Sequence, residues 1–171
     1  MAAPDPEHLF EQADRLATVP PAGAPRQADL RRAISAAYYG VFHCLLAAAA
    51  DRFVGVTKRG TVEYGRVYRS IDHRALRELC EDLRKTTLPA RYGPHLPSNG
   101  LGKNMPAMAA AFSELQDKRH AADYDPLARF KLSDAQLAIR TARRAVELFE
   151  KASAARRKIF LGLLLFPPRR G

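Results

Sequence analysis

Apolar residues recur at helical spacing along most of this chain. The clearest pattern lies between residues 30 and 53, where they form two stripes, at positions 30, 34, 38, 41 and 45 and at positions 39, 42, 46 and 53. Two stripes on one helix bury a wide arc of its surface, as is typical of the central helix of an antiparallel bundle. The pattern therefore predicts a central helix from about residue 28 to 53, ending near Gly55.

Further helical segments are expected before and after this central helix. They are 6 to about 18, 62 to 85, 104 to about 124, and a last long helix that begins near Ser133. The segment 62–85 is either continuous or broken near Ser70, which could cap its second part. No segment shows a strand pattern or a repeat. The fold class predicted for the single domain 1–171 is therefore all-α, an antiparallel bundle of four to five helices.

Two segments do not fit a simple bundle. Segment 86–104 contains three prolines and three glycines, so we expect a mobile surface loop. The C-terminal tail 156–171 combines basic residues with the apolar run 159–166, which as a helix would extend about 12 Å, well short of a hydrocarbon core of about 30 Å. We expect no integral membrane insertion and packing on the domain or on a partner; an anchor at a membrane surface is a weaker alternative.

Charge narrows the choice of partner. Among 171 residues, 28 Lys and Arg against 18 Asp and Glu give a formal net charge of +10. This excess favours a polyanionic partner such as RNA or an acidic protein. The alternative is a chain that uses arginine freely on a solvated surface, without a partner.

Cysteine usage and the N-terminal sequence bear on the compartment. Cys44 and Cys80 lie inside apolar helical patterns without the spacing of metal ligands, and we expect buried free thiols in a reducing compartment. The segment 1–7 is acidic and lacks an apolar stretch, which is not typical of a secretory signal. A cytoplasmic location is therefore expected.

Two motifs carry a family resemblance. The first is Tyr-Tyr-Gly-Val-Phe-His at 38–43, preceded by the basic pair at 31–32, and the second is Arg-His-Ala-Ala-Asp-Tyr at 119–124. Together they resemble the HEPN domain family, and most closely its small prokaryotic branch with Tyr-Tyr-x-x-Phe-His and Arg-x-x-Ala-Asp-Tyr signatures. The resemblance covers about residues 30 to 140. It implies an HEPN-like bundle, a homodimer and, in catalytically active relatives, a metal-independent endoribonuclease whose cleft is shared by two protomers.

The second motif supplies the candidate catalytic residues, Arg119, His120, Asp123 and Tyr124. By resemblance, Arg119 would contact phosphate and His120 would occupy the adjacent polar position. Tyr124 stands where nucleolytic relatives keep a histidine, and a phenol with a pKa of about 10 is a poor base at neutral pH. His120 could replace it chemically, although it points about 100° around the helix from Arg119. The alternative is an ion pair between Arg119 and Asp123, with the Tyr124 ring packed on the core.

Histidines elsewhere suggest different roles. If helix 62–85 is continuous, one face carries a basic stripe suited to an RNA phosphate backbone, formed by Arg66, Arg69, His73 and Arg77. The competing interpretation is a solvated charged face, because acidic residues interrupt the stripe. His43 lies on the second apolar stripe of the central helix, and we expect its imidazole to be buried and hydrogen-bonded to a neighbour.

Two functional hypotheses remain open at this stage. We find no glycine-rich phosphate loop and no metal-ligand motif, so no cofactor or metal is expected. The first hypothesis is an RNA-directed HEPN-like protein of toxin or defence type that acts as a metal-independent endoribonuclease. The alternative is a non-catalytic helical module that binds a nucleotidyltransferase-like antitoxin or an RNA without cleaving it.

Overall fold

The computed structural model describes residues 5–169, and every regular element in this range is helical. There are seven α-helices and two short 3-10 segments in these residues, so the predicted all-α class is confirmed. They are α1 (Pro6–Leu16), α2 (Gln27–Phe53), η1 (Val56–Lys58), α3 (Val62–Arg69), α4 (His73–Leu83), η2 (Ala90–His95), α5 (Asn104–Tyr124), α6 (Leu132–Lys151) and α7 (Ala154–Leu165).

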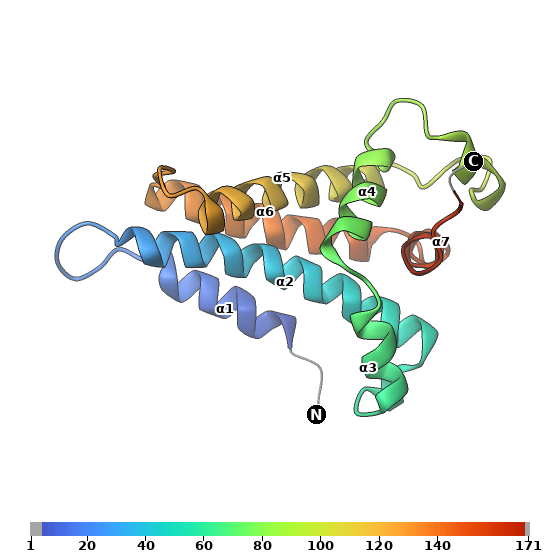
Figure 1. Ribbon diagram of the computed structural model, residues 1–171, viewed down its shortest axis with the longest axis horizontal. Coiled ribbons are helices and arrows are strands. Elements are labelled where there is room, and N and C mark those ends of the chain that lie inside the picture. The colour runs from blue at the N-terminus through green and yellow to red at the C-terminus, as the bar shows by residue number, and fades with distance from the viewer. Residues whose placement is uncertain (1–4, 170–171) are drawn as a thin grey trace.

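Four of these helices run along the long axis of the molecule, with α2 in contact with α1, α5 and α6 (Figure 1). Helices α1 and α5 run opposite to α2, whereas α6 runs in the same direction. The remaining α-helices α3, α4 and α7 gather at the end where α2 and α6 finish (Figure 1). The number of helices exceeds the four to five expected because 62–85 divides into two helices and the C-terminal tail forms a helix of its own.

Helix α2 is the core of the bundle. By length and hydropathy it is the one helix among the described residues that could cross a membrane, but 72% of its most apolar window is buried inside the protein. Gly40 allows α1 to approach closely, because a Cβ added there would lie 2.6 Å from the ring of Phe10. The two stripes predicted for this helix therefore face neighbouring helices on several sides.

The break after α3 differs from the expectation in one respect. Ser70 does not cap the next helix; its hydroxyl donates to the carbonyl of Val67 at 2.7 Å and closes α3. Asp72 is the N-cap of α4, accepting from the Ala75 N–H at 2.7 Å. Buried Ile71 lies between them and anchors the link to the core. A continuous helix over 62–85 is therefore wrong.

Segment 86–104 is more structured than expected. It contains η2, in which Tyr92 is buried and donates through its hydroxyl to Asp82 of α4 at 2.9 Å. Arg91 pairs with the same carboxylate, which also accepts from Lys85 at 2.5 Å. These contacts hold the middle of the segment against α4, where the sequence predicted only a loop.

The C-terminal tail packs on the domain, as expected. Its helix α7 contacts α2 and α4 and buries one face, formed by Phe160, Leu161, Leu163 and Leu164. Phe160 has no exposed surface and meets the Phe149 ring of α6 edge-on at 6.0 Å. Residues 170–171 of the predicted tail lie outside the described residues.

Candidate functional site

The first motif forms two neighbouring stripes on α2. Tyr38 and Phe42 lie one helical turn apart and are buried, whereas Tyr39 and His43 form the next stripe and remain partly exposed. The rings of Tyr39 and His43 stack with centroids 6.1 Å apart. One aromatic stripe therefore belongs to the core, and the other reaches the surface.

Arg119 of α5 lies against both stripes. Its Nη2 donates a hydrogen bond to the Tyr39 hydroxyl at 2.8 Å. Its guanidinium carbon lies 5.6 Å from the ring centre of Tyr38 and 5.4 Å from that of Tyr39, within the range of cation–π attraction. Only 13% of the side chain is exposed. The guanidinium is thus largely enclosed by aromatic rings.

The contact between Arg119 and Asp123 is electrostatic but poorly aligned. Arg119 Nε lies 2.9 Å from Asp123 Oδ2, yet Nε is buried without a hydrogen bond of acceptable geometry. Asp123 also accepts from the Ser35 hydroxyl at 3.3 Å. Burial acts to lower the pKa of Arg119, but the Tyr39 bond and the Asp123 charge outweigh it and the pKa is raised. Arg119 is therefore permanently charged.

The four candidate catalytic residues lie close together in the last two turns of α5. The Tyr124 ring centre lies 5.3 Å from the Arg119 guanidinium carbon and 5.0 Å from the His120 ring centre. Tyr124 is 62% exposed, so the alternative in which its ring packs on the core is wrong. The ion pair of that alternative, between Arg119 and Asp123, is present. The exposed imidazole of His120 is linked to Arg119 through the tyrosine.

His73 joins this cluster rather than a basic stripe. Its Nδ1 lies 2.7 Å from the hydroxyl of fully buried Tyr38, and its ring stacks on Phe42 with centroids 4.0 Å apart. A buried hydroxyl proton needs an acceptor, and Nδ1 provides one in the tautomer of neutral His73 that carries its own proton on Nε2.

His43 makes a similar pair with a tyrosine, as the sequence predicted. Its Nδ1 lies 2.7 Å from the Tyr68 hydroxyl of α3, and the two rings are nearly parallel with centroids 5.8 Å apart. Burial lowers the pKa of both His43 and His73, and the Arg119 charge lowers that of His73 further. Burial also raises the pKa of Tyr68 to about 12 and raises that of Tyr38. At neutral pH both imidazoles are therefore uncharged and both phenols protonated.

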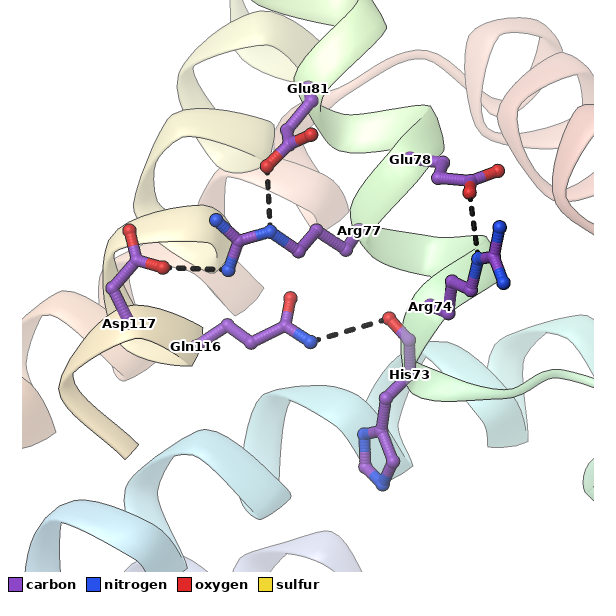
Figure 2. Close-up of polar contacts among 7 residues, drawn as sticks. All are labelled: His73, Arg74, Arg77, Glu78, Glu81, Gln116 and Asp117. Carbon is purple, nitrogen blue, oxygen red and sulfur yellow. Dashed lines mark hydrogen bonds and ion pairs between the residues drawn. The ribbon is translucent and has the colours of Figure 1, made fainter. Parts of the chain in front are cut away.

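The predicted RNA-binding stripe is not a single surface. Arg66 and Arg69 are exposed on α3, whereas Arg77 of α4 is held by Glu81 and Asp117, each at 2.6 Å. Figure 2 shows the His73 imidazole pointing towards α2, away from Arg77. The stripe required a continuous helix, and the break before His73 separates its members. Of the four residues predicted for the stripe, only Arg66 and Arg69 are exposed to solvent.

Some members of the cluster were not anticipated as site residues. Tyr38, Tyr39, Ser35 and Tyr68 supply the hydroxyls that meet the charged and imidazole groups. The adjacent phenols in the first motif were the available signal, but their partners are distant in sequence. Within residues 5–169, no group of three or more histidine, cysteine, aspartate or glutamate side chains is arranged to hold a metal ion.

Comparison with known proteins identified no relative that could assign a function to this cluster. No protein-family model, no curated protein and no solved structure matches the chain. The functional conclusion below therefore depends on the chemistry of the cluster and on the two sequence motifs.

Proposed function

We propose that this chain is an RNA-directed protein of the HEPN type, a metal-independent endoribonuclease in which Arg119 binds the scissile phosphate. The observation that carries the proposal is one permanent cation, enclosed by Tyr38 and Tyr39, beside the neutral imidazole of His73. The resemblance of the two sequence motifs supports the same assignment. The net charge of +10 would also favour an RNA partner.

The proposed chemistry uses the 2′-hydroxyl of the RNA as nucleophile. A base removes its proton, O2′ attacks phosphorus, the bond from phosphorus to O5′ breaks, and an acid protonates O5′. The products are a 2′,3′-cyclic phosphate and a 5′-hydroxyl. Arg119 would stabilise the charge that develops on the phosphate oxygens. Asp123 Oδ2 lies 2.9 Å from Arg119 Nε, so a phosphate oxygen would compete with that carboxylate for the guanidinium.

Proton transfer is assigned to the imidazoles. His43 would serve as the base in the tautomer that donates Nδ1–H to Tyr68, and His73 would serve as the acid in its protonated imidazolium form, which its lowered pKa makes the minor form at neutral pH. His120, the imidazole favoured by sequence, lies beyond the Tyr124 ring and is less suited to reach a phosphate at Arg119. A homodimer would bring two such clusters to a shared cleft, as the resemblance implies. The cytoplasmic location and the toxin or defence role belong to the same proposal.

RNA degradation without metal tests this proposal. The purified chain is incubated with total RNA in EDTA beside Arg119→Ala, Arg119→Lys and the control Arg140→Ala, whose side chain is exposed on α6. We expect wild-type protein and the control to degrade RNA, and both Arg119 variants to lose at least about a hundredfold in rate. Thermal unfolding of each variant verifies folding. Equal RNA loss with and without Arg119, or no loss in any sample, would contradict catalysis.

One observation favours the non-catalytic alternative. Three of the charged or imidazole groups already have partners within the chain: Arg119 has Tyr39 and Asp123, and His73 and His43 each meet a tyrosine hydroxyl. Such a network could serve to join α2 to α4 and α5. In that case the chain would bind RNA, or a nucleotidyltransferase-like antitoxin, without cleaving it. Intact RNA or such a protein co-eluting with the chain, with no cleavage products, would support this candidate.

A further inference from the structure

A second surface lies at the end of the molecule where α2 finishes. Phe53 ends α2, Val56 begins η1 and Phe166 follows α7, and these side chains are 59%, 60% and 62% exposed. The rings of Phe53 and Phe166 contact each other with centroids 5.6 Å apart. The two exposed rings, from the end of α2 and the residue that follows α7, therefore share one solvent-facing patch.

Two adjoining hollows between α2 and α7 lead into this patch. The first has a volume of about 570 Å³ and the second about 320 Å³, and they share Arg52, Lys158 and Leu161 in their walls. Phe149 lies at the inner side of the first hollow, and Phe53 and Phe166 line the second. We call the two together the α2–α7 groove.

The rim of the α2–α7 groove is cationic. Arg52, Arg157 and Lys158 line it, and the one acidic side chain in its walls, Asp51, is bound by Arg59 at 2.8 Å and by Tyr64 at 3.0 Å. The first turn of α7 contains no acidic residue. Arginine and lysine near the positive end of a helix dipole repel it, and a nearby anion would relieve that repulsion.

The α2–α7 groove lies further along α2 than Tyr39 of the Arg119 cluster. The groove residues of α2 begin at Ala48, and nine residues at a rise of about 1.5 Å each separate it from Tyr39 by roughly 13 Å along the helix axis. The groove therefore needs an occupant of its own, and its substitutions should leave the cluster intact.

We propose that this end of the protein binds an anionic lipid surface. The Phe53 and Phe166 rings enter the apolar side of the interface, and Arg52 and Lys158 contact the headgroups. Two half-exposed rings beside a cationic rim match the two layers of an anionic bilayer, a charged headgroup region above an apolar interior.

Vesicle flotation tests this assignment. Full-length protein is mixed with vesicles of phosphatidylglycerol and phosphatidylcholine, or of phosphatidylcholine alone. We expect binding to the anionic vesicles that weakens as salt rises, at least a tenfold loss for Phe53→Ser with Phe166→Ser, and a similar loss for Arg52→Ser with Lys158→Ser. The matched control is Val19→Ser with Leu127→Ser, because these side chains are 76% and 84% exposed in loops 17–26 and 125–131 at the opposite end of the bundle (Figure 1).

Three outcomes would overturn the proposal. They are no flotation with anionic vesicles, equal flotation on both kinds of vesicle, and equal flotation of the Phe53 and Phe166 double variant and the control. A loss of binding to a single-stranded oligonucleotide in the groove variants, without flotation of the wild type, would assign the groove to RNA. Melting temperatures within about 2 °C of wild type exclude misfolding as the cause. RNA degradation should be unchanged in the groove variants. A failure of the lipid proposal can therefore be distinguished from a failure of the Arg119 proposal.

Discussion

The Arg119 cluster and the α2–α7 groove both place cations beside aromatic rings, yet their surroundings differ. In the cluster, the guanidinium is 13% exposed and contacts a phenol and a carboxylate. In the groove, Phe53 and Phe166 are more than half exposed, and within residues 5–169 no ion pair is recorded for Arg52 or Lys158. The first arrangement contributes to the stability of the fold and leaves a small part of the cation for a phosphate, whereas the second leaves most of its apolar surface available to a ligand.

This difference has a general physical basis. A cation moved out of water loses hydration, so it is stable only where hydrogen bonds, an opposite charge or ring faces compensate. Arg119 has all three kinds of contact, and its removal should therefore affect folding as well as any activity. Substituting a cation that stays hydrated changes the free energy of unfolding little, because few compensating contacts are lost. Stability measurements can therefore separate the two regions before a ligand is known.

The largest effect is expected from the aromatic residue that holds α7, and with it the groove, on the bundle. Phe160→Ala should lower the free energy of unfolding by about 3–5 kcal/mol, because this side chain is fully buried against Phe149. Phe166→Ala, on the exposed end of the same segment, should change it by no more than about 0.5 kcal/mol. Urea denaturation followed by circular dichroism measures both. Similar losses for the two variants would refute the contrast between the buried and exposed faces of this segment.

The next largest effect on stability is expected from removing the enclosed cation Arg119, compared with removing the hydrated cation Arg52. Arg119→Ala should destabilise the protein by about 2–3 kcal/mol, because it leaves the Asp123 charge uncompensated and removes contacts with two rings. Arg52→Ala should have an effect within about 0.5 kcal/mol. The same urea titrations apply, with Arg119→Lys as the charge-conserving control. An Arg119→Ala protein as stable as wild type would show that the cluster does not support the fold.

A smaller effect is expected from a single hydroxyl. Tyr38→Phe removes the donor to His73 Nδ1 and should cost about 1–2 kcal/mol, because a buried acceptor loses its partner. The same change should raise the pKa of His73, since the hydroxyl stabilises the neutral ring. Histidine NMR titration measures that pKa, with Tyr68→Phe as the matched change at His43. An unaltered His73 titration would mean that the hydroxyl does not set its protonation.

The smallest effect is the pH dependence of stability. The pKa values of His43 and His73 are lowered in the folded protein, so below the ordinary value of about 6.5 the unfolded chain binds protons that the folded chain does not. Stability should therefore be complete above pH 6.5 and fall as pH drops towards the folded pKa values, by at most about 1.4 kcal/mol per pH unit for each imidazole. Thermal melts between pH 7.5 and 5 would record it. His43→Gln with His73→Gln should flatten the profile, and a slope equal to that of wild type would contradict this origin.

The sequence predicted more of the fold than of the site. Periodicity located α1, α2 and α5 within one or two residues, because the apolar spacing of a helix is a local property. The ion pair between Arg119 and Asp123 followed from their separation of four residues. The basic stripe across α3 and α4 was wrong because Asp72 can cap a helix where a continuous pattern was assumed. Local spacing therefore succeeded for contacts within one helix and failed where it had to decide whether 62–85 is one helix or two.

By itself, then, the amino-acid order determined the all-α class, the buried central helix, the strong positive charge and the two motifs. Only the tertiary structure decided that Arg119 meets Tyr39, which is 80 residues away, and that His73 turns from the expected stripe to Tyr38. The contact between Phe53 and Phe166, which forms where the C-terminal tail packs against α2, was likewise decided by the tertiary structure. The reason is physical: contacts one turn apart follow from helix geometry, whereas contacts between distant segments depend on how whole helices pack.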